Sequence, residues 1–202
     1  MAHRTLARRA EHEDVIKGSR FFAVVAPLAA PDEAEALVAA VRAAHPEAGH
    51  VAWATLWGDA RRWSDDGEPG GTAGRPMLEV LEKRGLDRAA AAVARRFGGV
   101  KLGAGGLARA YGGSVAKAVD AAGVAFVPDR DAYRVEAPFA AADALLRALQ
   151  ARADVVVAAP DYGPDGVVLT GTVLREAEEE LATLVADLTR GRGRWWADPL
   201  DT

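Results

Sequence analysis

The sequence predicts an α+β protein built of two folded units, and three observations lead to this expectation. Half of the 202 residues are hydrophobic, which is enough to bury a core. Strand-like apolar runs alternate with amphipathic helical segments along the chain. A polar turn that contains proline, at residues 128–131, interrupts this alternation and marks a boundary between the units.

Composition narrows the class of protein. The chain has no cysteine, which excludes disulfides, thiolate metal sites and a cysteine nucleophile. No window approaches the roughly 18 apolar residues that a membrane span needs, and no apolar export segment follows the basic residues near the N-terminus. We therefore expect a cytoplasmic protein that does not contact membranes.

The first elements follow from apolar patterns and from prolines. Aromatic and β-branched residues predict a strand at 19–26. A helix at 31–45 begins with proline and acidic residues, repeats apolar residues at helical spacing, and ends before Pro46. Strands at 50–57 and 61–64, joined by a turn at 58–59, come next.

The later elements of the first unit are separated by glycines. A short helix at 76–84 ends at Gly85. Residues 89–97 fit both helix and strand, because alanine favours helices but no cap precedes this run, and we assign a strand. A long helix at 107–121 follows four residues rich in glycine, and a strand is expected at 124–127.

The second unit has its own order of elements. The expected elements are a strand at 132–137, a helix at 138–151, a strand at 154–159, a turn at 163–166, a strand at 167–174, a helix at 176–190 and a strand at 193–197. This β-α-β-β-α-β order is that of ferredoxin-like domains. The expected organisation is an N-terminal extension at 1–16, a first domain at 17–128 and a ferredoxin-like domain at 129–202.

Charge is distributed unevenly along the chain. Residues 61–117 carry 11 Lys and Arg against 6 Asp and Glu, whereas residues 131–202 carry 7 against 13. This contrast indicates an anionic partner for the first unit, and it is equally typical of ordinary solvated faces.

The segment 64–74 is a glycine-rich acidic loop, SDDGEPGGTAG. Its distinctive residues are Ser64, Asp65, Asp66, Gly67, Glu68, Gly71, Thr72 and Gly74. The glycines allow backbone N–H groups to gather around an anion, whereas Asp65, Asp66 and Glu68 offer oxygen ligands for Mg²⁺ or Ca²⁺. A structural alternative is favoured over the metal: the carboxylates cap the next helix or pair with Arg75, Arg95 or Arg96.

A second glycine-rich loop, at 98–106, enters the long helix. Unpaired N–H groups at a helix start attract phosphate, so we expect Gly103, Gly105 and Gly106 to take part in an anion site. The cations expected around a phosphate or nucleic-acid backbone are Arg75, Arg95, Arg96, Lys101 and Arg109. The loop lacks the Lys-Ser/Thr ending of a Walker A motif. The alternative explanation of its glycines is close packing of the helix on the sheet.

Other candidate residues are few. A catalytic set of Ser64, His50 and Asp65 has no nucleophile-elbow pattern around the serine. Trp195 and Trp196 are neighbours in a strand and must point to opposite faces, so one is expected to be exposed, where it could stack on a base.

The two glycine loops together resemble a known family. The blocks SDDGEPGGTAGRPML (64–78) and RRFGGVKLGAGGLARAYGGSV (95–115) are similar to the signature of the Impact family, which comprises the bacterial YigZ-like proteins and the eukaryotic Impact translation regulators. The resemblance covers roughly residues 17–120. Arg75 replaces a lysine of the family pattern and Arg96 an aromatic residue; His50 matches the signature histidine, but Val51 replaces the polar residue that commonly follows it.

The resemblance implies a fold and a set of functions. The first domain is expected to resemble domain 2 of ribosomal protein S5, and the second the last domain of elongation factor G. The resemblance implies a binding protein associated with RNA or the ribosome and linked to translation regulation, without a cofactor or DNA specificity, and with a protein partner as a further option. The alternative is an enzyme that acts on a nucleotide or a small phosphorylated ligand with Mg²⁺.

Overall fold

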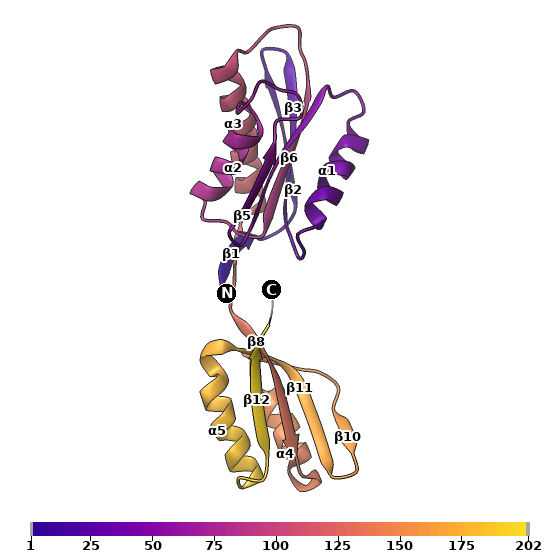
Figure 1. Ribbon diagram of the computed structural model, residues 1–202, viewed down its shortest axis with the longest axis vertical. Coiled ribbons are helices and arrows are strands. Elements are labelled where there is room, and N and C mark those ends of the chain that lie inside the picture. The colour runs from indigo at the N-terminus through magenta and orange to yellow at the C-terminus, as the bar shows by residue number, and fades with distance from the viewer. Residues whose placement is uncertain (1, 201–202) are drawn as a thin grey trace. The chain divides into compact units, whose positions relative to one another are not determined.

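The chain divides between Val127 and Pro128 into two compact units in the computed structural model, which describes residues 2–200 (Figure 1). The expected domains began at residue 1 and ended at residue 202. Of these bounds, Met1 and Thr202, together with Asp201, lie outside the described residues. Both units are built of antiparallel sheets and helices, so the described chain is an α+β protein. Within residues 2–200, no helix combines the length and the apolar character that crossing a membrane requires.

The first unit contains a five-stranded antiparallel sheet. Its strands, in spatial order, are β2 (Ala10–Ile16), β3 (Ser19–Pro27), β6 (Ala89–Arg96), β4 (His50–Trp57) and β5 (Ala60–Ser64). Its helices are α1 (Glu33–Ala44), α2 (Gly74–Lys83) and α3 (Ala104–Ala122). Helices α2 and α3 cover one face of the sheet and α1 covers the other (Figure 1).

Strand β6 lies at the centre of this sheet, which confirms the strand expected at 89–97. Its side chains alternate between two cores: Ala91 and Val93 pack under α2 and α3, whereas Ala92 and Ala94 pack under α1. A strand buried on both faces needs no polar alternation, which is why its sequence resembled a helix.

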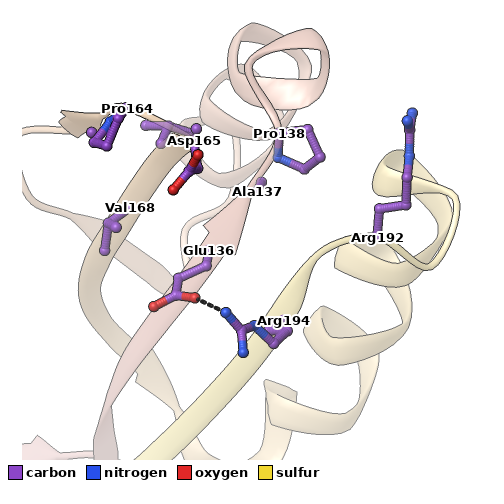
Figure 2. A pocket seen from close by; sticks show the side chains of 11 residues that line it. Glu136, Ala137, Pro138, Pro164, Asp165, Val168, Arg192 and Arg194 are labelled. Atoms are coloured by element: carbon purple, nitrogen blue, oxygen red, sulfur yellow. Dashed lines mark hydrogen bonds and ion pairs between the residues drawn. The ribbon is translucent and has the colours of Figure 1, made fainter.

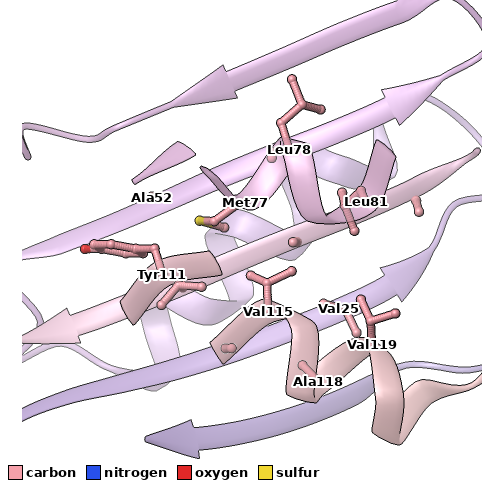
Figure 3. Packing of buried hydrophobic residues seen from close by; sticks show 14 of the residues in the cluster. Val25, Ala52, Met77, Leu78, Leu81, Tyr111, Val115, Ala118 and Val119 are labelled. Atoms are coloured by element: carbon pink, nitrogen blue, oxygen red, sulfur yellow. The ribbon is translucent and has the colours of Figure 1, made fainter. Parts of the chain in front are cut away.

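The larger core of the first unit lies between the sheet and helices α2 and α3 (Figure 3). Met77, Leu78 and Leu81 reach it from α2, and Tyr111 and Val115 reach it from α3. The Tyr111 ring is fully buried against the edge of the Phe21 ring, with 5.2 Å between the ring centroids.

Two strands of the first unit, at 3–6 and 10–16, lie in the region expected as an N-terminal extension at 1–16. Strand β1 (His3–Leu6) pairs with β7 (Val124–Val127), and all seven residues of β2 pair with β3. Because β2 is an edge strand, its sequence AEHEDVI is mostly polar, so it lacks the apolar pattern by which strands are recognised.

The second unit packs two helices on one face of a second antiparallel sheet. Its elements are β8 (Arg130–Ala137), α4 (Phe139–Gln150), β9 (Val155–Val157), β10 (Asp161–Gly163), β11 (Gly166–Leu174), a 3₁₀ turn (Arg175–Ala177), α5 (Glu178–Thr189) and β12 (Arg194–Pro199). The strand order is β10-β11-β8-β12, with β9 also paired to β11. The strand expected at 154–159 is present as the shorter β9, and β10 was not expected. Both strands pair with β11, and Pro160, which has no N–H to donate, lies between them.

One glycine of the second loop has a packing role. The backbone of Gly98 lies against Gly18 in the turn between β2 and β3, and a Cβ on Gly98 would lie 1.8 Å from the Gly18 carbonyl carbon. No side chain fits there without displacing backbone. Gly113 in α3 is the opposite case, because a Cβ there would have no neighbour within 4 Å.

We therefore expect Gly98→Ala to lower the free energy of unfolding of the first unit by about 3 kcal/mol, as overpacking against backbone does. The matched variant Gly113→Ala should raise it by about 0.5–1 kcal/mol, because alanine favours the helix. Urea unfolding followed by circular dichroism and tryptophan fluorescence measures both. Equal stability of Gly98→Ala and the natural chain would contradict this assignment.

Candidate functional site

The acidic glycine loop folds around the carboxylate of Asp65. This carboxylate accepts hydrogen bonds from the backbone N–H groups of Gly71 (2.8 Å), Ala73 (2.9 Å) and Gly74 (2.9 Å). Since Gly74 begins α2, Asp65 satisfies N–H groups at the start of that helix and lies at the positive end of its dipole. The first loop therefore supplies its own anion.

Asp66 fastens the loop to the sheet and to α1. Its Oδ2 accepts the Val51 N–H (2.6 Å) and a bond from the Arg42 guanidinium (3.1 Å). Its carbonyl oxygen lies 2.7 Å from Nδ1 of His50. Because a carbonyl only accepts, Nδ1 of His50 carries the proton in this contact.

Glu68 is buried and connects the first glycine loop to strand β6 and helix α3. Its carboxylate accepts two bonds from Nη1 of Arg95 (2.7 and 3.0 Å) and one from the Tyr111 hydroxyl (2.7 Å). The Arg95 and Glu68 side chains are only 8% and 3% exposed. Burial, followed by the bond to Glu68, raises the pKa of Tyr111 well above its usual range, so the hydroxyl remains a donor.

These contacts give each of the three carboxylates of the loop a structural partner. Asp65, Asp66 and Glu68 bind separate partners, and residues 2–200 contain no group of three acidic or histidine side chains that could hold a metal ion. Ser64 accepts the Asp66 N–H through Oγ (3.1 Å), so Ser64, His50 and Asp65 each bond to loop backbone rather than to one another. The capping and pairing alternative describes this loop.

The other signature residues shape the same backbone. Thr72 donates its hydroxyl to the Pro69 carbonyl (2.6 Å) and is buried. A Cβ on Gly74 would lie 2.6 Å from the Ser64 carbonyl oxygen, so the loop closes on itself there. Gly67 and Gly71 have φ values of +84° and +75°, which favour glycine.

The second loop leaves the start of α3 open. Gly103 caps this 19-residue helix with φ +71° and without a side-chain hydrogen bond, and no acidic residue lies in the first turn. Gly105 and Gly106 belong to that turn, so the helix starts three residues earlier than expected. Its first N–H groups are therefore available to an external acceptor.

The predicted cations separate into two groups. Arg95 is buried in its pair with Glu68, which removes it from the cations that a ligand could reach. Arg96, Lys101 and Arg109 are exposed, and no hydrogen bond or ion pair holds their side chains within the described part of the chain. Arg75 is exposed and has a 3.3 Å contact with Glu79.

A groove between α2 and α3, here named the α2–α3 groove, brings the first loop and the third helix together. Its volume is about 400 Å³. Its lining residues are Gly71, Arg75, Pro76, Glu79, Val80, Lys83, Ala108, Arg109, Gly112 and Gly113. Gly112 and Gly113 have no side chains to fill the α3 side of the groove. Its three cations, Arg75, Lys83 and Arg109, outnumber its single carboxylate, Glu79.

The second unit has a hollow of about 360 Å³ of its own, beside the β10–β11 turn. Pro164 and Asp165 lie on one side of it, and an ion pair between Arg194 and Glu136 (2.7 Å) lies on the other (Figure 2). Arg192 extends away from that pair in Figure 2. Because Glu136 neutralises Arg194, this hollow attracts an anionic ligand more weakly than the α2–α3 groove does.

Two residues of the candidate site were missed in the sequence. Tyr111 completes the Glu68 network, and its place on the buried face of α3, four residues after Leu107, was the available signal. Lys83 joins the groove, and its spacing of four and eight residues from Glu79 and Arg75 puts all three on one side of α2.

We expect Glu68→Gln to lower the free energy of unfolding of the first unit by about 3–5 kcal/mol, since it leaves the buried Arg95 charge without a partner. Tyr111→Phe should cost about 1–3 kcal/mol, because one bond to the carboxylate is lost. Chemical unfolding curves measure both.

The control is Glu79→Gln, which removes the same charge from a half-buried surface carboxylate that contacts Arg75 and Lys83. Its effect should stay within about 0.5 kcal/mol. A Glu68→Gln variant as stable as Glu79→Gln would show that the buried pair does not hold the loop.

Comparison with known proteins identifies relatives that share the region of the two loops. The family model named Impact N-terminal domain matches residues 17–119, about half of the chain. An "IMPACT family member in pol 5'region" of Thermus thermophilus is 43% identical over 88% of this chain and 97% of its own length. "IMPACT family member YigZ" of Escherichia coli is 47% identical over 52% of this chain and 53% of its own.

The likeness extends to a complete solved structure. A structure titled "Crystal structure of an hypothetical protein" aligns with 100% of this chain and 98% of its own, with a TM-score of 0.74 and 31% identity. The matched family region contains both glycine loops and the buried network that joins them. The chain belongs to the Impact family.

Proposed function

We propose that this protein binds RNA, in ribosomes or in ribosome-associated transcripts, through the α2–α3 groove and the start of α3. The observation that carries the proposal is the groove itself. Three cations from two helices, Arg75, Lys83 and Arg109, line one hollow with a single acidic side chain. A phosphate backbone is the common biological ligand with the charge and the length to follow such a groove.

The start of α3 supports the same ligand. The N–H groups of its first turn have no side-chain cap. Lys101 lies in the loop before α3 and Arg109 in its second turn, and neither has an ion-pair partner among residues 2–200. A helix start favours phosphate through both its free N–H groups and its dipole. RNA bound here would link the protein to translation, and its site of action would be the cytoplasm.

Fold analogy adds a weaker argument. The four-strand order of the second unit, with β12 and β8 adjacent and β11 between β8 and the edge strands, is typical of ferredoxin-like domains. We assign the first unit to the fold of domain 2 of ribosomal protein S5 by the family resemblance. Both assignments fit a protein of the translation apparatus, and neither identifies a ligand.

The alternative, an enzyme for a nucleotide or a phosphorylated metabolite with Mg²⁺, has less support. The carboxylates that it would use as metal ligands already hold backbone N–H groups, Arg42, Arg95 and Tyr111. Releasing them would undo the loop. A protein partner on the acidic second unit is compatible with RNA binding by the first.

Binding of a short single-stranded RNA should weaken with salt, with a log–log slope of about −2 to −3 if three or four phosphates are neutralised. Arg109→Gln should weaken binding and reduce the slope by about 0.7, because it removes one phosphate contact. Fluorescence anisotropy at a series of KCl concentrations measures the slope.

The control is Arg147→Gln, an equal loss of charge at an exposed arginine of α4 in the second unit. It should leave the slope unchanged. Binding that does not depend on salt, or equal effects of the two substitutions, would contradict the proposal. A shift in melting temperature with a nucleotide and Mg²⁺, without RNA binding, would favour the enzyme.

A further inference from the structure

Trp63 gives the candidate site a flat aromatic surface. It lies on β5, one of the two edge strands of the five-stranded sheet, and 44% of it is exposed. The guanidinium of Arg75 lies over its ring, 5.5 Å from the ring centroid. Because Arg75 also lines the α2–α3 groove, the aromatic surface adjoins the phosphate-binding cations.

We propose that the Trp63–Arg75 pair stacks an unpaired base, so that the site takes single-stranded RNA in preference to a duplex. This inference rests on the proposed function. Aromatic rings and guanidinium planes both stack on bases, and only bases outside a helix can reach them. A duplex would present phosphates to the groove but leave Trp63 without a partner.

The other tryptophans are placed differently. Trp53 and Trp57 are half-buried and pack against the core under α1, on the opposite face of the sheet. Trp195 stacks on Tyr133 in the core of the second unit. Trp196 is the matched case: it is 39% exposed and has Arg194 over its ring at 5.5 Å.

Trp196 nevertheless lacks the phosphate site. Its arginine is bound to Glu136 at 2.7 Å, and Glu136 also accepts a bond from Arg134, so both guanidinium groups already have a carboxylate partner. The unpaired cations that we assign to phosphate, Lys101 and Arg109, are in the first unit. A stacking platform contributes to affinity where the backbone of the same strand is held.

The test uses the full-length chain, an unstructured RNA of about ten nucleotides, a length within the range for single-strand sites, and the duplex of the same sequence. Trp63→Ala should weaken single-strand binding by about 5- to 150-fold and leave duplex binding unchanged. Trp63→Phe should retain most of the affinity, because it keeps an aromatic face. Binding of the single strand should quench tryptophan fluorescence in the natural chain and much less in Trp63→Phe.

Trp196→Ala is the matched control and should leave both affinities unchanged. Circular dichroism and melting temperature verify that each variant is folded. Equal affinity of Trp63→Ala and the natural chain for the single strand, or equal affinity of the natural chain for duplex and single strand, would overturn the inference while RNA binding stands. If neither RNA binds the natural chain, the proposed function itself fails, and this inference fails with it.

Discussion

The buried ion pair between Arg95 and Glu68 is the contact on which the candidate site depends. Arg95 is the penultimate residue of β6, Glu68 lies in the middle of the first glycine loop, and Tyr111 adds α3 to the pair. The guanidinium also lies 5.6 Å from the centroids of both the Phe21 and Phe97 rings. Because two charges lose their water here, the pair gives little net stability, but removing one partner leaves the other exposed to a strongly unfavourable environment. The pair therefore fixes where the two loops lie relative to each other.

The two glycine loops solve the same electrostatic problem in different ways. Each leads into a helix whose first N–H groups need acceptors. At α2, Asp65 supplies the acceptor from within the loop. At α3, Gly103 supplies none. The Asp65 carboxylate accepts three loop N–H groups, two of them at the start of α2. It is thus an example, within the same unit, of the kind of anion that the start of α3 lacks.

Most of the fold could be predicted from the sequence, and the failures have identifiable physical causes. The helices and central strands show apolar patterns because they are buried, but β2 is polar because it lies at an edge. The helix start at Ala104 was placed late because two glycines in its first turn appeared to belong to a loop.

The candidate site was predictable in its parts but not in its pairings. The glycine loops and the cations are visible in the sequence, and the option that the acids pair with arginines was among those considered. That Arg95 rather than Arg96 is the buried partner depends on strand alternation, which directs Arg95 toward α2 and α3 and leaves Arg96 exposed. Tyr111 joins Glu68 across 43 residues, a separation that no local pattern can show.

The alanine-rich strand β6 has a consequence for how this protein can vary. Small side chains on both faces of the central strand let helices approach the sheet closely from both sides. Each alanine methyl group of β6 therefore packs in a space that is already filled by its neighbours. Larger apolar residues, which most strands would accept, would push the helical layers apart on one face or the other. Since α2 and α3 form the groove, a substitution at Ala91 would change its width without touching it. Residues deep in the sheet thus set the spacing of side chains at the surface, although they never reach the surface themselves.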